Sequence, residues 1–162
     1  MVHNVQTGAF VNCTFVHNKT GANKKFYGGS GLTTNINCLY VDNTNAAGAV
    51  CSVDVEPSTA GPIQFLSCAF GPDKQADLQE DEFCLDFVSP YFAGTSSYME
   101  KFPKTAFYTP TRSSPFYGKG QVLNWTEADL DLAGNLRVRE GMVDIGCYQC
   151  WLKPEGAVII LR

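Results

Sequence analysis

The sequence lacks the features that mark several common classes of protein. It has no run of roughly 18 or more apolar residues, so no membrane-spanning helix is expected. Residues 1–12 show no basic start followed by an apolar run, so no signal peptide is expected there. The 12 basic residues are scattered and are outnumbered by 16 acidic ones, which gives a net charge of −4. Proteins that bind nucleic acids concentrate Lys and Arg on one face, so we expect no nucleic-acid partner.

Histidine is scarce, with two among 162 residues, whereas cysteine is abundant. The seven cysteines are an odd number, and a chain of this length can bury a core without disulfides. Cys147 and Cys150 have the spacing of a zinc or redox pair, but no second Cys pair is present to complete a zinc site. We therefore predict no zinc, and a disulfide from Cys147 or Cys150 to another late cysteine such as Cys84 stays open as an alternative.

The strongest pattern in the chain is a repeat around three cysteines. Residues 11–18, 36–43 and 66–73 align on these cysteines, which are 25 and then 30 residues apart. Every second position of the alignment is apolar, and this is the period of a β-strand with one buried face. The three apolar columns are Val11, Ile36 and Leu66, then Cys13, Cys38 and Cys68, then Phe15, Tyr40 and Phe70.

A unit this small cannot bury its own apolar face, so neighbouring copies must stack on one another. Stacked β-rungs predict an all-β fold, a parallel β-helix of about three rungs over residues 1–75. Cysteine suits an inward column because it is small and among the most buried residue types. We therefore assign a structural packing role to Cys13, Cys38 and Cys68.

Two polar positions recur beside the cysteines. Five residues after each cysteine stands Asn or Asp, residue types that tolerate left-handed backbone and close turns. These residues, to which we assign a structural role at the end of each strand, are Asn18, Asn43 and Asp73. The residue before each cysteine is also polar in every copy, as Asn12, Asn37 and Ser67 show.

Residues 76–162 have a different character. They are rich in Ser, Thr, Pro, Gly and aromatic residues with few periodic stretches, which is typical of loops over a surface. We expect the repeat to stop after Asp73, with a turn or a brief helix over residues 74–82. Late strands are expected near residues 143–151 and 157–161. Because an open solenoid end exposes unpaired backbone and apolar surface, we expect residues 76–162 to form a loop-rich C-terminal cap that packs on the helix as one unit.

Four segments of this C-terminal part match a known pattern in order and spacing. They are Ser-Pro-Tyr-Phe at 89–92, Ser-Pro-Phe-Tyr-Gly-Lys-Gly at 114–120, Asp-Leu-Ala-Gly-Asn-Leu-Arg at 131–137 and Val-Asp-Ile-Gly-Cys-Tyr-Gln at 143–149. Together with the cysteine rungs, they resemble the C-terminal part of bacterial pectate-lyase-like proteins, which are right-handed parallel β-helices that end in a choice-of-anchor Q domain. The resemblance implies a right-handed coil, structural roles for Arg137 and Asp144, and a secreted or cell-surface location.

The resemblance carries further expectations. Contact with a membrane is expected only through the anchor of the parent protein, and Met1 is expected to open a fragment or a trimmed chain. The chain departs from the family pattern at Ala133, Cys147 and Gln149, where the family usually has Asp, Ala and Glu. The departures at Ala133 and Gln149 remove acidic groups and weaken the case for a family metal site.

Asp129 and Asp131 begin a stretch, Asp-x-Asp-x-Ala-Gly, that is similar to the opening of a calcium-binding loop. The third oxygen ligand is missing, and no bidentate Glu follows at the required distance. We therefore predict no metal or cofactor, and calcium at Asp129 and Asp131 stays as the alternative. The expected role of the two carboxylates is to pair with Arg137 or Arg139 in a turn.

The predicted fold also suggests cleavage of acidic polysaccharides, which needs a pair of carboxylates or a base beside a neutralised carboxylate. Residues that could line one face are Asp42, Asp54, Glu56 and Lys25, with Lys24 beside the last of them. No paired-Asp or His-Gly motif supports them, and a fold alone does not establish an activity. A polysaccharide lyase or a glycoside hydrolase is therefore the alternative function.

Aromatic rings on a surface are platforms for sugar rings, and the C-terminal part contains many aromatic residues. The candidates for carbohydrate binding are Tyr98, Tyr108 and Trp125. We predict a non-catalytic terminal segment of a secreted or cell-surface protein, which caps the solenoid and contributes to polysaccharide binding or adhesion. A purely structural role, as the end of a stiff stalk, is the third class that the sequence leaves open.

Overall fold

The computed structural model describes residues 2–3, 7–20, 27–28, 31–53, 55, 62–75, 78–88 and 109–150. Every regular element in these ranges is a β-strand, which confirms the predicted all-β class. None of the described residues belongs to a helix with the length and apolar character that a membrane crossing requires. The strands are β1 (Val2–His3), β2 (Thr7–Val11), β3 (Thr14–Val16), β4 (Tyr27–Gly28), β5 (Leu32–Ile36), β6 (Leu39–Val41), β7 (Ile63–Leu66), β8 (Ala69–Phe70), β9 (Gln79–Glu80) and β10 (Leu85–Asp86).

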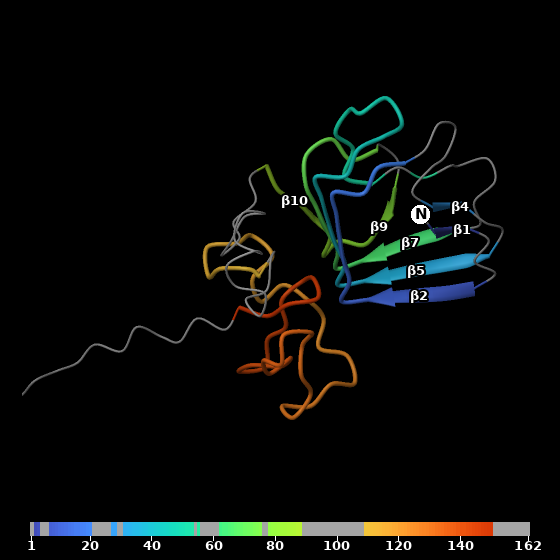
Figure 1. Cartoon of the computed structure of the whole chain (residues 1–162). Helices are drawn as coiled ribbons and strands as arrows, with labels where there is room; N and C mark the ends of the chain where they lie inside the picture. The colour runs from blue at the N-terminus through green and yellow to red at the C-terminus, as the bar shows by residue number, and fades with distance from the viewer. Residues whose placement is uncertain are drawn as a thin grey trace, which may run out of the picture.

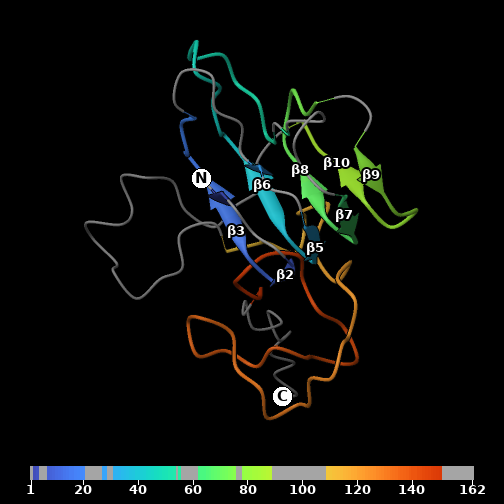
Figure 2. The same ribbon diagram turned by 90° about the vertical axis from the view of Figure 1, so that its right-hand side faces the viewer.

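All the strand pairs are parallel, and most strands belong to two larger sheets. Sheet I has the order β2-β5-β7-β9 (Figure 1), and sheet II has the order β3-β6-β8-β10 (Figure 2). β1 pairs with β4 in a third, two-stranded sheet. A strand of sheet II follows each strand of sheet I, so β2-β3, β5-β6, β7-β8 and β9-β10 form levels 1 to 4 of one stack. This arrangement is compatible with a β-helix-like solenoid.

A column of cysteines runs through the core between the two sheets. Cys38 and Cys68 are buried, and Cys13 packs against the same cluster. The column has a fourth member, Cys84, whose Sγ accepts a hydrogen bond from the backbone N–H of Cys68 (3.3 Å). All seven thiols of the chain are free, so the alternative disulfide from Cys84 to Cys147 or Cys150 is absent.

The thiols make the same hydrogen bond at three successive levels. Each donates to the carbonyl of the residue three positions before the cysteine of the preceding level. The bonds run from Cys38 to Phe10 (3.3 Å), from Cys68 to Asn35 (3.4 Å) and from Cys84 to Phe65 (3.3 Å). Burial raises the pKa of the Cys68 thiol, which keeps it protonated and able to donate. Cysteine therefore serves the core both as a small apolar group and as a weak donor.

A stack of aromatic rings lies beside the cysteines. The ring of Phe15 is 4.8 Å from that of Tyr40, and Tyr40 is 5.5 Å from Phe70, with nearly parallel planes in both pairs. The buried Tyr40 hydroxyl donates to Oδ1 of Asn35 (2.8 Å). This polar pair occurs at level 2 only, since levels 1 and 3 have Phe at both positions. Like side chains stack on like, as in any register of parallel strands that repeats.

The prediction that Val11, Ile36 and Leu66 form an inward column is wrong. The inward positions of sheet I are one residue earlier, at Phe10, Asn35 and Phe65. The cause is the corner between the sheets. There the residue before each cysteine adopts left-handed backbone, which interrupts the in-and-out alternation of side chains along the strand. The corner residues and their φ angles are Asn12 (49°), Asn37 (53°) and Ser67 (48°).

The second predicted turn also differs in detail. Left-handed backbone occurs at His17 and Asp42, one residue before the predicted Asn18 and Asn43, although Asp73 has it as expected. The two asparagines stack instead. Oδ1 of Asn43 accepts hydrogen bonds from the backbone N–H (2.9 Å) and the Nδ2 (3.0 Å) of Asn18. Their structural role is therefore a ladder of amides between levels 1 and 2.

The repeat does not stop after Asp73, because β9 and β10 add a short fourth level where a turn or brief helix was predicted. Here the inward columns change from aromatic to acidic. Glu80 pairs in register with Phe65, and Asp86 with Phe70. Lys74 bridges the two carboxylates (2.9 and 2.8 Å), and its Nζ lies 5.1 Å from the centre of the Phe70 ring. We call these three charged residues the charged lid.

Sheet II is buried on both faces at β6 and β8, whereas one buried face was predicted. Its outer face carries Leu39, Val41 and Ala69, which form a second core cluster with Phe116 and Ile145 from the C-terminal part. Residues 109–150 contain isolated bridges but no strand. The strand predicted near 143–151 is therefore absent as far as residue 150, and the one near 157–161 lies outside the described residues.

Candidate functional site

The corner between the two sheets is where residues 109–150 attach. Figure 1 shows this segment, in orange and red, beside the arrowheads of β2 and β5. Its described residues pack against the outer face of sheet II through Phe116 and Ile145. The corner residues Asn12, Asn37 and Ser67 are all buried, and their side chains bind this segment.

The side-chain amide of Asn37 forms two hydrogen bonds with the backbone of Gln121, as a peptide group of a neighbouring strand would. The backbone N–H of Gln121 donates to Oδ1 of Asn37 (2.7 Å), and Nδ2 of Asn37 donates back to the Gln121 carbonyl (2.9 Å). The Gln121 side chain reaches level 3 through Ser67 Oγ (3.0 Å), and Asn12 at level 1 donates to the Gly146 carbonyl (3.1 Å). A single polar position repeated over three levels thus fastens the C-terminal part.

The two late motifs of the sequence meet at this corner. Asp131 Oδ1 accepts from the backbone N–H of Ala133 and of Asn135 (2.8 Å each). Its Oδ2 accepts from the backbone N–H of Gln149 (2.8 Å). Both oxygens of Asp131 thus have backbone donors, and no group of three metal-ligating side chains occurs among the described residues. Asp131 therefore closes a turn and joins it to the last motif.

Arg137 has different partners from those predicted. Its guanidinium donates to the carbonyls of Gly146 and Cys147 (3.4 Å each) and lies 5.4 Å from the centre of the Trp125 ring. No ion pair to Asp129 or Asp131 occurs within the described ranges. Burial lowers the pKa of Arg137. The guanidinium nevertheless stays charged at neutral pH.

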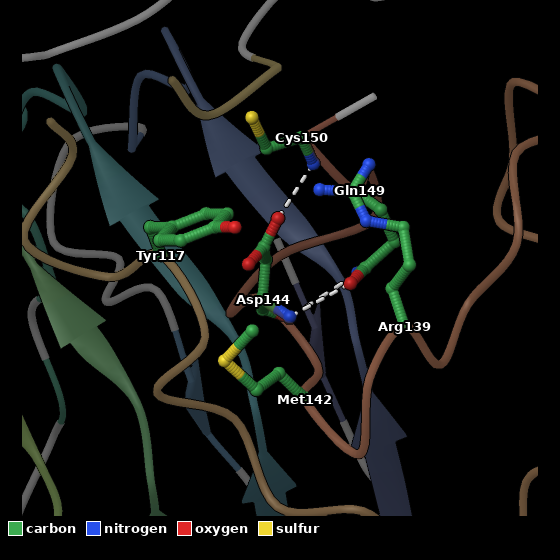
Figure 3. A pocket seen from close by; sticks show the side chains of 6 residues that line it. All are labelled: Tyr117, Arg139, Met142, Asp144, Gln149 and Cys150. Carbon is green, nitrogen blue, oxygen red and sulfur yellow. Dashed lines mark hydrogen bonds between the residues drawn. The ribbon is translucent and has the colours of Figure 1, made fainter. Parts of the chain in front are cut away.

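Asp144 is a second buried charge, and it holds the end of the segment in place. Its carboxylate accepts from the backbone N–H of Gly118 (2.6 Å) and of Cys150 (2.5 Å), and its own N–H donates to Gln149 Oε1 (2.7 Å; Figure 3). Burial raises the pKa of this carboxyl. The surrounding cavity, with a volume of about 10 Å³, has room for about one water molecule, so the arrangement is a structural clasp.

A much larger hollow lies between the corner and the loop that carries Trp125. Its volume is about 500 Å³, within the range of small-molecule sites. We call it the Trp125 hollow, and its lining includes Asn12, Asn124, Trp125, Asp129, Leu130 and Arg137. An adjoining hollow of about 660 Å³ shares Asn12, Leu130 and Arg137 and adds Asp131 and Cys147. Burial raises the pKa of the Cys147 thiol, so this wall is uncharged at that position.

The lining of the Trp125 hollow combines the groups that recognise sugars. An indole ring offers a flat apolar face, and carboxylate and amide groups form hydrogen bonds with hydroxyls. The second oxygen of Asp129 is used, because Oδ2 accepts from the N–H (2.6 Å) and the hydroxyl (3.0 Å) of Thr126. Asn124 is exposed at the rim. The arrangement can bind a ring with several hydroxyls.

The structure brings together some of the predicted site residues and leaves others apart. Trp125, Asp129 and Arg137 line one hollow, although the sequence analysis assigned them to three separate roles. Asp42 is partly buried in the turn after β6. The remaining candidates, which lie outside the described residues, are Lys25, Asp54, Glu56, Tyr98 and Tyr108. Sequence reasoning missed Asn12 and Asn124, and the recurring polar residue before each cysteine was the signal for Asn12.

No family model, curated protein or solved structure matches the chain. The resemblance to pectate-lyase-like proteins therefore stands on its motifs.

Proposed function

We propose that the chain is the non-catalytic terminal segment of a secreted or cell-surface protein, and that it binds a polysaccharide. In this proposal residues 1–75 belong to a right-handed parallel β-helix of the pectate-lyase-like kind. Residues 76–162 are a choice-of-anchor Q-like region that packs on it. The observation that carries the binding function is the Trp125 hollow, in which Trp125, Asp129 and Arg137 converge.

The solenoid part of the proposal has its own support. Parallel strands in two sheets share one register over four levels, and like side chains stack in the cysteine and aromatic columns. Parallel crossovers in one sheet are right-handed in nearly all proteins, which favours that hand here. Two β-faces stiffened by such columns suit a protein that works outside the cell, where the shape of a long rod is useful for display or adhesion.

Binding is favoured over cleavage by the carboxylates near the hollow. Glycoside hydrolases use two carboxyl groups, one on each side of the scissile bond. Asp129 lines the Trp125 hollow, but both oxygens of neighbouring Asp131 accept hydrogen bonds from the protein backbone. The described lining thus offers one carboxylate for hydroxyls. A lyase or hydrolase acting on acidic glycans remains the outcome that the test below can reveal.

The test is retention of the protein on immobilised polysaccharides, combined with an assay for released sugar products. We expect retention without product release. Trp125→Ala should weaken retention by about tenfold or more, a loss of about 1.4 kcal/mol of binding free energy or more. The matched control is Phe83→Ala, which removes an exposed aromatic ring from the β9-β10 turn and does not alter this lining. Product release would establish the enzymatic alternative, and equal retention of both variants would remove the hollow from the proposal.

A further inference from the structure

We propose that the ligand of the Trp125 hollow is a neutral glycan and not an acidic one. This inference rests on the proposed function and names the class of sugar for the same site. It separates this chain from the acidic-glycan chemistry that the sequence resemblance suggests.

The charges around the hollow do not favour an anion. Asp129 and Arg137 line the hollow, and Asp131 lines the adjoining one. Two carboxylates therefore face one cation across this connected lining. The chain as a whole, with these three residues included, has a net charge of −4. A polymer with a carboxylate or sulfate on each sugar would meet repulsion both at the hollow and on approach to the protein.

The one cation of the lining already has partners within the protein. The guanidinium of Arg137 donates to two carbonyls, those of Gly146 and Cys147, and packs over the Trp125 ring. Recognition of a uronate or sulfate by arginine uses a bidentate pair of N–H donors. The exposed fraction of Arg137 is only 8%, so its guanidinium would have to give up these contacts to form such a pair. Its role is to orient the ring of Trp125.

The polar groups that remain for a ligand suit hydroxyls. The amide of Asn124 and Oδ1 of Asp129 have no hydrogen-bond partner within the described residues. An amide can both donate to and accept from a hydroxyl, whereas an ionised carboxylate only accepts. A neutral sugar supplies hydroxyl donors for Asp129 and an apolar ring face for Trp125. An acidic group placed beside Asp129 would find another acceptor and no donor.

The experiment compares polysaccharides that share a sugar skeleton and differ in charge. Isothermal titration uses oligomers of neutral galactan, sulfated galactan and polygalacturonate, with neutral glucan and mannan oligomers as further probes. We expect binding to at least one neutral oligomer, with an affinity that changes less than about twofold between 50 and 500 mM salt because no net charge is neutralised. The acidic oligomers should bind at least about tenfold more weakly than that neutral ligand.

Two variants test the roles of individual side chains. Asp129→Asn keeps an oxygen to accept from Thr126 and removes the charge. The affinity of this variant for the neutral oligomer should stay within about twofold of the wild-type value. The difference in affinity between neutral and acidic oligomers should become smaller. Asn124→Ala changes an exposed side chain, so folding is not at risk, and it should weaken neutral binding by about threefold or more. Urea unfolding midpoints for both variants confirm that the fold is intact.

The outcomes distinguish this inference from the proposed function. Tighter binding of an acidic oligomer, with steep loss of affinity at high salt, would overturn the neutral-glycan inference and leave polysaccharide binding standing. Absence of binding to every oligomer, neutral and acidic, would overturn both. Neutral binding that is tighter than acidic binding, is weakened by about threefold or more in Asn124→Ala and is kept in Phe83→Ala would establish both.

Discussion

The strand levels and residues 109–150 are held together in different ways. In the levels, each contact is one of a series. The cysteine thiols make the same bond at successive levels, and Phe15, Tyr40 and Phe70 form one stack. In residues 109–150, by contrast, the groups that contact the levels follow no repeat of their own. Asn37 has one partner segment, and the Asp144 carboxylate has one pair of N–H donors.

The difference teaches where a change to the chain should act. Loss of one member of a series leaves a defect in a core that is shared by all levels, so the whole stack is expected to lose stability. Loss of a single contact in residues 109–150 is expected to release that segment from the corner while the levels persist. Four predictions test this contrast, from the largest effect to the smallest.

The aromatic stack should show the largest effect. Phe70 is fully buried between Tyr40 and the charged lid. Phe70→Ala should lower the free energy of unfolding by about 3–5 kcal/mol, because a large core side chain is replaced by a cavity. The exposed Phe83 gives the control, since Phe83→Ala should change it by no more than about 0.5 kcal/mol. Urea unfolding measures both, and similar losses in the two variants would contradict the assignment of the core.

The corner should show a smaller and more local effect. Asn37→Ala leaves the N–H and carbonyl of Gln121 without partners and should cost about 2–3 kcal/mol. Hydrogen exchange should then be faster at the Gln121 amide than in the wild type and unchanged at Phe65 in β7. Asn37→Gly separates the causes, because glycine accepts the φ of 53° but lacks the amide. If the glycine variant were as stable as the wild type, backbone strain and not the amide pair would explain the loss.

Two glycines of the segment provide a matched pair, because Gly146 packs against β3 and Gly134 is exposed. Gly146 and Gly134 both have positive φ, but a Cβ at Gly146 would lie 2.9 Å from Oγ1 of Thr14, whereas one at Gly134 would meet nothing within 4 Å. Gly134→Ala should cost about 1 kcal/mol and Gly146→Ala about 2 kcal/mol. The difference in urea midpoint measures the close approach of the segment to β3. Equal losses would show that only backbone strain matters at both positions.

The smallest expected effect is a pH dependence at Asp144. Burial raises the pKa of this carboxyl in the folded state, so the folded protein holds the proton more tightly than the unfolded chain. The contribution of Asp144 to stability is therefore complete below the unfolded pKa, near 3.9 for Asp, and declines as the pH rises through the folded value. Relative to Asp144→Asn, the wild type should therefore lose stability as the pH rises over this interval. Urea unfolding from pH 4 to 7 measures the difference in unfolding free energy between the two proteins. A wild type that gains stability relative to Asp144→Asn as the pH rises would contradict the prediction.

The sequence predicted the levels better than the segment for the same physical reason. Repetition made the cysteine and aromatic columns visible, because each column is confirmed by its other members. The left-handed corner was hidden at Ser67, a residue type that rarely adopts that backbone. The fourth level was hidden because it is short and its inward positions, Glu80 and Asp86, are charged.

The candidate site was predictable residue by residue but not as a site. Trp125, Asp129 and Arg137 were each visible as sequence features. Their meeting in one hollow depends on the hydrogen bonds that Asn12 and Asn37 form with the segment. Asn12 and Asn37 recur with the repeat, but their partners Gly146 and Gln121 follow no period in the sequence. Tertiary contacts of this kind follow from the folded geometry alone.

The charged lid gives the stack a direction. Each level from β2 to β8 offers the next one a matching set of apolar columns, so a further level of the same kind could be inserted between them without new chemistry. A further level cannot stack in the same way on the charged lid, because it would have to bury the charges of Lys74, Glu80 and Asp86. Duplication of an interior level would therefore leave the charged lid at β9 and β10 unchanged.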